Sequence, residues 1–353
     1  MTSAKRQATI VEVARIANTS TATVSRVLSG ADYPVSSALR DAVLKAAAEL
    51  NYVPNAISQS LKIGKSCDIG VIIPSFSNPF YMQMISGVEM VCRQEGYNPI
   101  FCSSNNDENQ EIANIELMRR KCVEGLILSS IHSDIQEACP ALEMHEHVVL
   151  FDQATKHESC DRVLFDFEKG GYMAIRYLLQ KGHRRIAFLS APVENRHSRR
   201  ALYRGCQKAV AEWGGGAECR LITADIQAED QSAFEYETGR RLAREVLELE
   251  DRPTAVFVYN DIAAAGAMSQ LTAKGLLVPR DISVVGFDDI ILAAYTSPPL
   301  TTVRQPAFET GAAATRLIMD SIRNQNHTFY EVNLQPQLVE RETVRDINER
   351  RTV

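Results

Sequence analysis

Long apolar segments are missing from this chain of 353 residues. No run approaches the roughly 18–20 apolar residues that a membrane-spanning helix needs, and the N-terminus lacks the apolar core of a signal peptide. These absences predict a cytoplasmic protein without a membrane partner.

Regularly spaced cysteines are missing as well. The eight cysteines are scattered and form no C-x-x-C motif, so they indicate neither a disulfide framework nor a zinc site. We expect them to be reduced and mostly buried as small apolar residues, and we expect no metal.

The motifs of common enzyme classes are also absent. The sequence has no G-x-G-x-x-G, no G-x-x-x-x-G-K-[ST] and no H-E-x-x-H, and its seven histidines include no spaced metal pair. The glycines at 214–216 follow an expected helix instead of opening one. We therefore expect neither enzyme activity nor a cofactor.

Charge is present but unevenly distributed. The net charge is −6, yet residues 1–65 contain eight Lys or Arg against four Asp or Glu. The basic head confines any nucleic-acid contact to that segment, because phosphates repel the acidic remainder. The chain is also too long for one typical domain, which predicts two or three.

Two short amphipathic segments, 10–17 and 21–28, flank a break at Asn18–Ser20. Asn18 tolerates the left-handed conformation of a tight turn, and Ser20 is a good N-cap for the second segment. This pattern is typical of a helix-turn-helix, whose second helix enters the DNA major groove. A small helical bundle with a solvated polar face is the alternative. The expected DNA contacts of this segment are Ser20, Thr21, Ala22, Thr23, Ser25 and Arg26.

A third helix is expected from Ser36–Ser37 to about Leu50, and the head to end at residue 53. Residues 54–66 then form a hinge, in which Pro54 breaks the chain and 55–61 is long enough for about one and a half helical turns. Such a short helix is unstable alone and needs DNA and a partner chain. The expected hinge contacts are Asn55, Ser58 and Leu61, with the leucine as a minor-groove wedge.

From Asp68 onward, apolar strand-like runs alternate with helical segments up to the run at 300–306. Near-continuous apolar strands separated by helices indicate parallel sheets that are covered on both faces. The pattern occurs in two series, which predicts two similar α/β lobes within residues 67–340. The fold class is therefore α/β, with an all-α helix-turn-helix head and a charged tail at 341–353.

Ligands of such folds bind beyond the carboxyl ends of the strands. Acids, amides and aromatic rings converge there, which suits a polyhydroxylated or heterocyclic ligand. Helix capping alone is the alternative explanation for Asn260–Asp261 and for Asp288–Asp289. The candidate ligand contacts are Phe80, Tyr81, Ser129, Asp152, Asn260, Asp288 and Gln305.

The order of TVSRVL, LNYVPNAISQSLK and IGVIIPSFSNPFY resembles the LacI/GalR family of bacterial transcriptional regulators, over roughly residues 9–340. The resemblance implies a two-lobed body like that of periplasmic binding proteins. It also implies that Thr21 and Ala22 help to choose the operator, that Arg26 contacts DNA and that Leu61 enters the minor groove. The positions that match family effector contacts are Phe80, Tyr81, Asp152, Asn260, Asp288 and Gln305.

The chain departs from the family pattern at three places. The turn reads Asn18-Thr19-Ser20 instead of Gly-Val-Ser, and Ser58 replaces a common hinge alanine. Many members also place a ligand-binding arginine three residues before the glycine that matches Gly205, where this chain has Leu202. Either Arg200 reaches the ligand from a shifted turn, or the arginine contact is absent.

The resemblance predicts a homodimer, since the tail after residue 341 contains no leucines for the family's tetramer seam. Two-fold symmetry then predicts a pseudo-palindromic double-stranded DNA operator and a nucleoid-associated repressor. A small molecule, a sugar or related metabolite, would change the angle between the lobes and thereby the hinge, as an inducer or as a corepressor. A solute-binding protein without a DNA role is the alternative.

Overall fold

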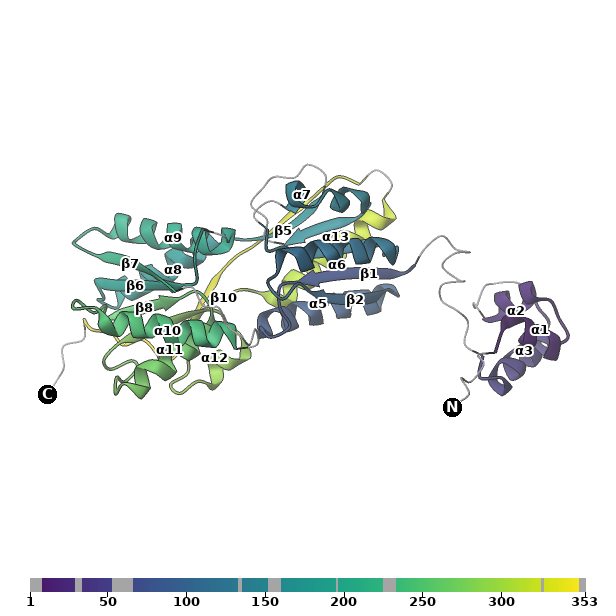
Figure 1. Ribbon diagram of the computed structural model, residues 1–353, viewed down its shortest axis with the longest axis horizontal. Helices are drawn as coiled ribbons and strands as arrows, with labels where there is room; N and C mark the ends of the chain where they lie inside the picture. The colour runs from purple at the N-terminus through teal and green to yellow at the C-terminus, as the bar shows by residue number, and fades with distance from the viewer. Residues whose placement is uncertain are drawn as a thin grey trace. The chain divides into compact units, whose positions relative to one another are not determined.

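The computed structural model describes residues 8–28, 34–52, 66–132, 135–151, 160–194, 196–224, 233–324 and 327–348. The chain forms two compact units, Met1–Cys67 and Asp68–Val353 (Figure 1). The predicted hinge contacts Asn55, Ser58 and Leu61 lie outside the described residues, as does the predicted ligand contact Asp152.

In the described part of the first unit the helices are α1 (Ile10–Ile16), α2 (Thr21–Leu28) and α3 (Ser37–Glu49). Their apolar faces meet in one small core. Asn18 has a φ of 48°, so it supplies the left-handed turn that the sequence predicts. The side chain of Ser20 accepts a hydrogen bond from the backbone N–H of Thr23 at 3.1 Å, which confirms the predicted cap.

The second unit contains two lobes, each built on a six-stranded sheet. The first lobe has the parallel strand order β11-β5-β4-β3-β1-β2. Its strands are β1 (Asp68–Ile73), β2 (Asn98–Ser103), β3 (Gly125–Ser129), β4 (Val148–Phe151), β5 (Asp161–Phe165) and β11 (Glu331–Leu334).

Alternating side chains of the first sheet enter separate cores on its two faces, as in a strand buried on both sides. Val71 packs with α5 (Pro79–Glu95) and α13 (Ala307–Arg323), whereas Ile72 packs with α6 (Glu108–Arg120). The short α7 (Ile135–Ala138) and the 3-10 helix η1 (Pro140–Met144) lie on the α6 side.

The second lobe has the strand order β12-β10-β9-β8-β6-β7, with only β12 antiparallel to its neighbour. Its strands are β6 (Arg185–Ser190), β7 (Glu218–Thr223), β8 (Ala255–Val258), β9 (Ser283–Asp288), β10 (Thr301–Arg304) and β12 (Gln337–Val339). Its helices are α8 (Phe167–Gln180), α9 (His197–Trp213), α10 (Phe234–Glu248), α11 (Asp261–Ala273) and α12 (Ile291–Tyr295).

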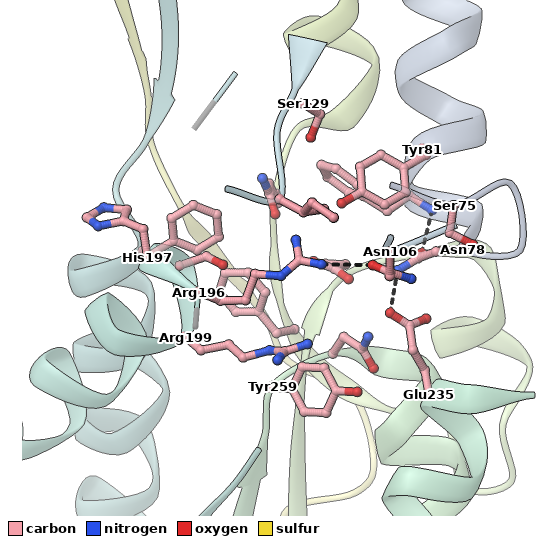
Figure 2. A pocket seen from close by; sticks show the side chains of 18 of the residues that line it. Ser75, Asn78, Tyr81, Asn106, Ser129, Arg196, His197, Arg199, Glu235 and Tyr259 are labelled. Carbon is pink, nitrogen blue, oxygen red and sulfur yellow. Dashed lines mark hydrogen bonds between the residues drawn. The ribbon is translucent and has the colours of Figure 1, made fainter. Parts of the chain in front are cut away.

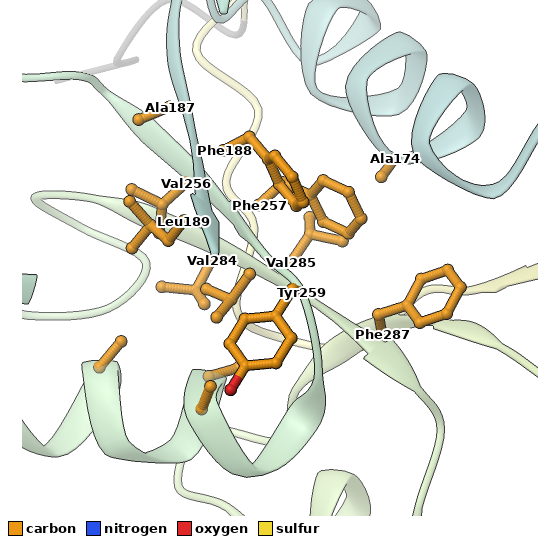
Figure 3. Packing of buried hydrophobic residues seen from close by; sticks show 14 of the residues in the cluster. Ala174, Ala187, Phe188, Leu189, Val256, Phe257, Tyr259, Val284, Val285 and Phe287 are labelled. Atoms are coloured by element: carbon orange, nitrogen blue, oxygen red, sulfur yellow. The ribbon is translucent and has the colours of Figure 1, made fainter. Parts of the chain in front are cut away.

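In this lobe α8 pairs with α9 on one face of the sheet, and α10 pairs with α11 on the other (Figure 1). Phe188 and Phe257 lie on the side of Ala174 of α8, whereas Leu189 and Val256 lie on the opposite side (Figure 3). The two phenylalanine rings stack at 5.1 Å. Side chains that alternate along each strand therefore form a core on both faces of this sheet too.

The chain crosses between the lobes three times, at 165–167, 304–307 and 334–337. The sequence predicts two series of alternating strands and helices, and the structure contains both. It does not predict α13, β11 and β12. After β10, α13 returns to the first lobe beside α5, and β11 joins the edge of the first sheet. Each lobe is therefore assembled from distant parts of the chain.

Part of the C-terminal segment that we expected to be a charged tail packs against the second lobe. Thr343 is buried, and its hydroxyl donates to the carbonyl oxygen of Val284 at 2.6 Å. The backbone N–H of Ile347 donates to the carbonyl of Lys181 at 2.8 Å. Residues up to 348 thus complete the second lobe, because they satisfy backbone groups of β9 and of the C-terminal end of α8.

Candidate effector cavity and DNA-reading head

A cavity of about 140 Å³ lies between the two lobes, at the carboxyl ends of their strands (Figure 2). This volume is well below the roughly 300–1,000 Å³ of sites for drug-sized ligands, so it suits one small ring system. Both lobes contribute polar and aromatic side chains. The lining includes Ser75, Asn78, Phe80, Tyr81, Asn106, Ser129, His132, Phe151, Phe167, Arg196, His197, Ser198, Arg199, Leu202, Phe234, Glu235, Tyr259, Asn260, Phe287, Asp288 and Gln305.

The start of α5 presents two aromatic rings to the cavity. Asn78 caps this helix by accepting from the backbone N–H of Phe80 at 2.9 Å, and Pro79 occupies its first position. The ring of Phe80 stacks on Phe151 at 6.3 Å and meets Tyr81 edge-on at 5.2 Å. Burial raises the pKa of Tyr81, which therefore remains a neutral hydroxyl donor and acceptor.

Asp288 lies at the end of β9 in a strained backbone conformation with φ 104°. Strain of this kind in a residue other than glycine is concentrated at functional sites. Burial, and then the neighbouring Asp261 and Glu235, raise the pKa of its carboxyl group. The next residue, Asp289, has a structural role, since it pairs with Arg304 at 2.7 Å and Arg341 at 2.6 Å.

Asn260 both caps α11 and lines the cavity. Its side-chain oxygen accepts from the backbone N–H of Ala263 at 2.8 Å, as the alternative explanation predicted, and the residue also lines the cavity. Asp261 instead faces the interior, where it accepts from Thr302 Oγ1 at 2.6 Å and from the backbone N–H of Ile290 at 2.9 Å. Burial raises its pKa to about 7.

The structure places Arg199, and not Arg200, on the cavity wall. Residues three apart share one face of a helix, so Arg199 lies on the same face of α9 as the lining residue Leu202. Arg200 is rotated by about 100° and donates to the carbonyl of Glu194. The expectation that Arg200 reaches the cavity is therefore corrected in favour of its neighbour.

The remaining predicted contacts that fall on described residues all line the cavity: Phe80, Tyr81, Ser129, Asn260, Asp288 and Gln305. Their binding of a ligand stays a prediction. They were found because the carboxyl ends of parallel strands meet at one edge, and both sheets turn that edge toward the cavity.

Four lining residues that the sequence did not single out form hydrogen bonds between the lobes. Asn78 Nδ2 donates to Glu235 Oε1 at 3.2 Å, and Arg196 donates to Asn106 Oδ1 at 2.8 Å (Figure 2). The partners lie 157 and 90 residues apart in the chain. Two of the four carry a local sequence signal: Asn106, whose φ is 57°, marks a turn, and Asn78 precedes Pro79 at the start of α5.

The outward face of α2 agrees with the predicted reading face. Thr21, Ala22 and Arg26 are exposed, and so is Ser20 before the helix, while Val24 and Val27 enter the core. Thr23 and Ser25 are half-buried. These exposures are compatible with DNA contacts, which remain predictions for the individual residues.

The described residues contain no group of three or more His, Cys, Asp or Glu able to hold a metal ion. Among the helices that are described, none combines the length and apolar character needed to cross a membrane.

Comparison with known proteins supports both units. Residues 9–55 match the family described as bacterial regulatory proteins, lacI family, and residues 175–344 match the periplasmic binding protein-like domain. The HTH-type transcriptional repressor PurR of Vibrio atlanticus (strain LGP32) is 35% identical over 345 residues, covering 97% of this chain and 100% of that relative.

Two solved structures extend the comparison. The lac repressor dimer bound to operator and the anti-inducer ONPF has a TM-score of 0.81 at 27% identity, with 96% of this chain and 100% of that chain covered. The complex of the transcriptional regulator CelR with cellobiose has a TM-score of 0.68 at 27% identity, with 95% and 99% covered. The chain therefore belongs to the LacI family of DNA-binding transcriptional regulators, with a helix-turn-helix head and a ligand-binding body.

Proposed function

We propose that this protein is a repressor whose affinity for a pseudo-palindromic operator is set by a sugar or related small metabolite in the interlobe cavity. The observation that carries the proposal is the cavity itself, which is lined from both lobes and spanned by the Asn78–Glu235 and Arg196–Asn106 hydrogen bonds. A ligand that replaces or strengthens these bonds has different affinities for the open and closed lobes. That difference is what allows it to shift a conformational equilibrium.

The size and lining of the cavity support a small polar ligand. Rings such as Phe80 and Phe167 offer apolar faces, while Asn260, Asp288 and Gln305 offer acceptors and donors. The relative CelR was solved with cellobiose, a sugar. Binding without chemical conversion is part of the proposal, because the relatives PurR and the lac repressor are repressors.

The mechanism couples the cavity to the head through residues 54–66. Since the chain crosses between the lobes at three points, a change of lobe angle moves all three crossings together. In a dimer such a movement changes the distance between the two copies of the segment before Asp68, and operator affinity changes with it.

The test begins with the full chain selecting its operator from a random DNA pool. Operator affinity is then measured by fluorescence anisotropy with and without each member of a panel of sugars, sugar acids, nucleosides and bases. At least one ligand is expected to change the affinity about 5- to 150-fold. Constant affinity across ligands that bind the body would contradict the proposal, and so would chemical conversion of the bound ligand seen by NMR.

A further inference from the structure

One wall of the interlobe cavity is built by the first turn of α9. Arg196, His197, Ser198 and Arg199 all line the cavity from this turn. Arg196 is the N-cap residue of this helix and forms no side-chain capping hydrogen bond, and the first turn contains no acidic residue. Its free backbone N–H groups and the positive end of its dipole therefore act together with two guanidinium groups.

The two arginines retain hydrogen-bonding capacity toward the cavity. A guanidinium has five N–H donors. Arg199 donates to the carbonyl of Pro192 at 3.2 Å and stacks over the ring of Tyr259 at 5.1 Å. Arg196 donates to Asn106 at 2.8 Å. Within the described part of the chain, neither guanidinium forms an ion pair with a carboxylate.

Two carboxyl groups line other parts of the cavity. Glu235 accepts from Asn78, and Asp288 lies at the end of β9. Burial raises the pKa of both carboxyl groups, while the nearby Arg199 and Arg196 lower that of Glu235. Since neither carboxyl group is ion-paired with these guanidinium groups in the described residues, the guanidinium groups can bind an anion on the side of α9.

We propose that the effector is a small polyhydroxylated anion, a monosaccharide that bears a carboxylate or phosphate group, and that Arg199 and Arg196 bind this group at the start of α9. This proposal rests on the proposed function and specifies its ligand. An oxyanion accepts the remaining guanidinium donors in a bidentate manner, which a neutral hydroxyl cannot do. The hydroxyl groups of the ligand then donate to Asp288 and Glu235 on the other side.

The position of Arg199 also accounts for the apolar residue at 202. Leu202 lies one turn further along the same face of α9, and its side chain is buried at 2% exposure. The charge is thus moved toward the helix N-terminus, where the dipole adds to it. A guanidinium at position 202 would lie deeper in the helix and away from the free N–H groups.

The experiment measures binding to the full chain by calorimetry, with D-glucose, D-glucuronate, D-gluconate, D-glucose 6-phosphate and inorganic phosphate as probes. The anionic sugars are expected to bind at least about tenfold more tightly than glucose, and the carboxylate and phosphate probes identify the anionic group. Arg199→Gln is expected to weaken anion binding roughly 10- to 100-fold, the loss expected for a charge-assisted hydrogen bond.

Arg200→Gln is the matched comparison, because it removes the same charge from the adjacent position without altering the cavity wall. It is expected to bind the anions as the unmodified chain does. Equal losses in both variants, or tighter binding of glucose than of its anions, would overturn the inference while leaving the proposed function intact. Anion binding that does not change operator affinity would instead contradict the proposed function.

Discussion

Asn78 Nδ2 donates to Glu235 Oε1 at 3.2 Å, although the two residues belong to different lobes. Asn78 is buried and caps α5, so its side chain is held in place by the first lobe. Glu235 projects from the first turn of α10 in the second lobe. The bond therefore forms only when the two lobes are close together at the wall of the cavity.

Glu235→Ala is expected to shift the ligand-free chain toward an open arrangement of the lobes. The variant loses one hydrogen bond between the lobes while the cap on α5 remains. A net contribution of about 0.5–1.5 kcal/mol corresponds to a shift of roughly 2- to 12-fold in the ratio of closed to open forms. Distance distributions between spin labels on the two lobes measure this ratio.

Glu237→Ala provides the control for that measurement. Glu237 lies two residues along α10 and pairs with Arg240 at 3.2 Å on the surface, so its removal leaves the cavity unchanged. Similar distance distributions in both variants would show that the Asn78–Glu235 bond does not hold the lobes together.

The sequence predicts most of the strands and helices because both lobes repeat one local pattern. The ends of the neighbouring strands β8 and β9 supply Asn260 and Asp288, and their proximity follows from the parallel arrangement alone. The hydrogen bond between Arg196 and Asn106 has no such signal, since it depends on how two separately folded lobes face each other.

The elements that the sequence analysis missed are α13, β11 and β12. α13 carries small residues, including Gly311, because it packs closely on α5: a Cβ atom at Gly311 would lie 2.0 Å from the carbonyl oxygen of Met84. The sequence pattern of such a segment indicates a helix, but it does not indicate which lobe the helix joins. The strands β11 (EVNL) and β12 (QLV) contain polar residues and lack the continuous apolar run that marks strands such as β4 (VVLF) and β8 (AVFV).

Asp261→Asn is expected to change the pH dependence of stability. The folded pKa of about 7 is above the ordinary value of 3.8, so between about pH 4 and 7 the folded chain binds more protons at this site than the unfolded chain. The free energy of unfolding therefore falls as pH rises through this window, by at most about 1.4 kcal/mol per pH unit from this group. Urea unfolding at several pH values measures the slope, which is expected to flatten in the variant.

Asp281→Asn is the comparison for this titration. The hydrogen bond from Arg280 and that from the backbone N–H of Leu277 lower the pKa of Asp281, so its contribution has the opposite sign and acts below about pH 4. An unchanged slope between pH 4 and 7 in Asp261→Asn would show that this carboxyl group does not titrate there.

Arg26→Ala is expected to reduce specific operator binding about 10- to 100-fold, the loss typical of a direct base contact, while ligand binding by the body is unchanged. Arg26 is exposed on α2, the second helix of the head. Lys45→Ala removes one exposed charge from α3 of the same unit and is expected to weaken specific and nonspecific binding equally. Anisotropy with operator and scrambled DNA separates the two effects; equal weakening on both DNAs in Arg26→Ala would exclude base recognition by this residue.

Gly205→Ala is expected to disturb the cavity from a position outside it. A Cβ atom at Gly205 would lie 1.9 Å from the carbonyl oxygen of Glu168, so α9 has to move away from α8. We expect a loss of about 1–3 kcal/mol in the free energy of unfolding and weaker ligand binding, because Arg199 moves with the helix. Lys208→Ala removes an exposed side chain of α9 that lies over the ring of Tyr172; it is expected to lower the free energy of unfolding by less than about 1 kcal/mol and to leave ligand affinity unchanged. Thermal unfolding and calorimetry measure both, and a destabilised variant with unchanged affinity would show that the placement of α9 does not control the ligand site.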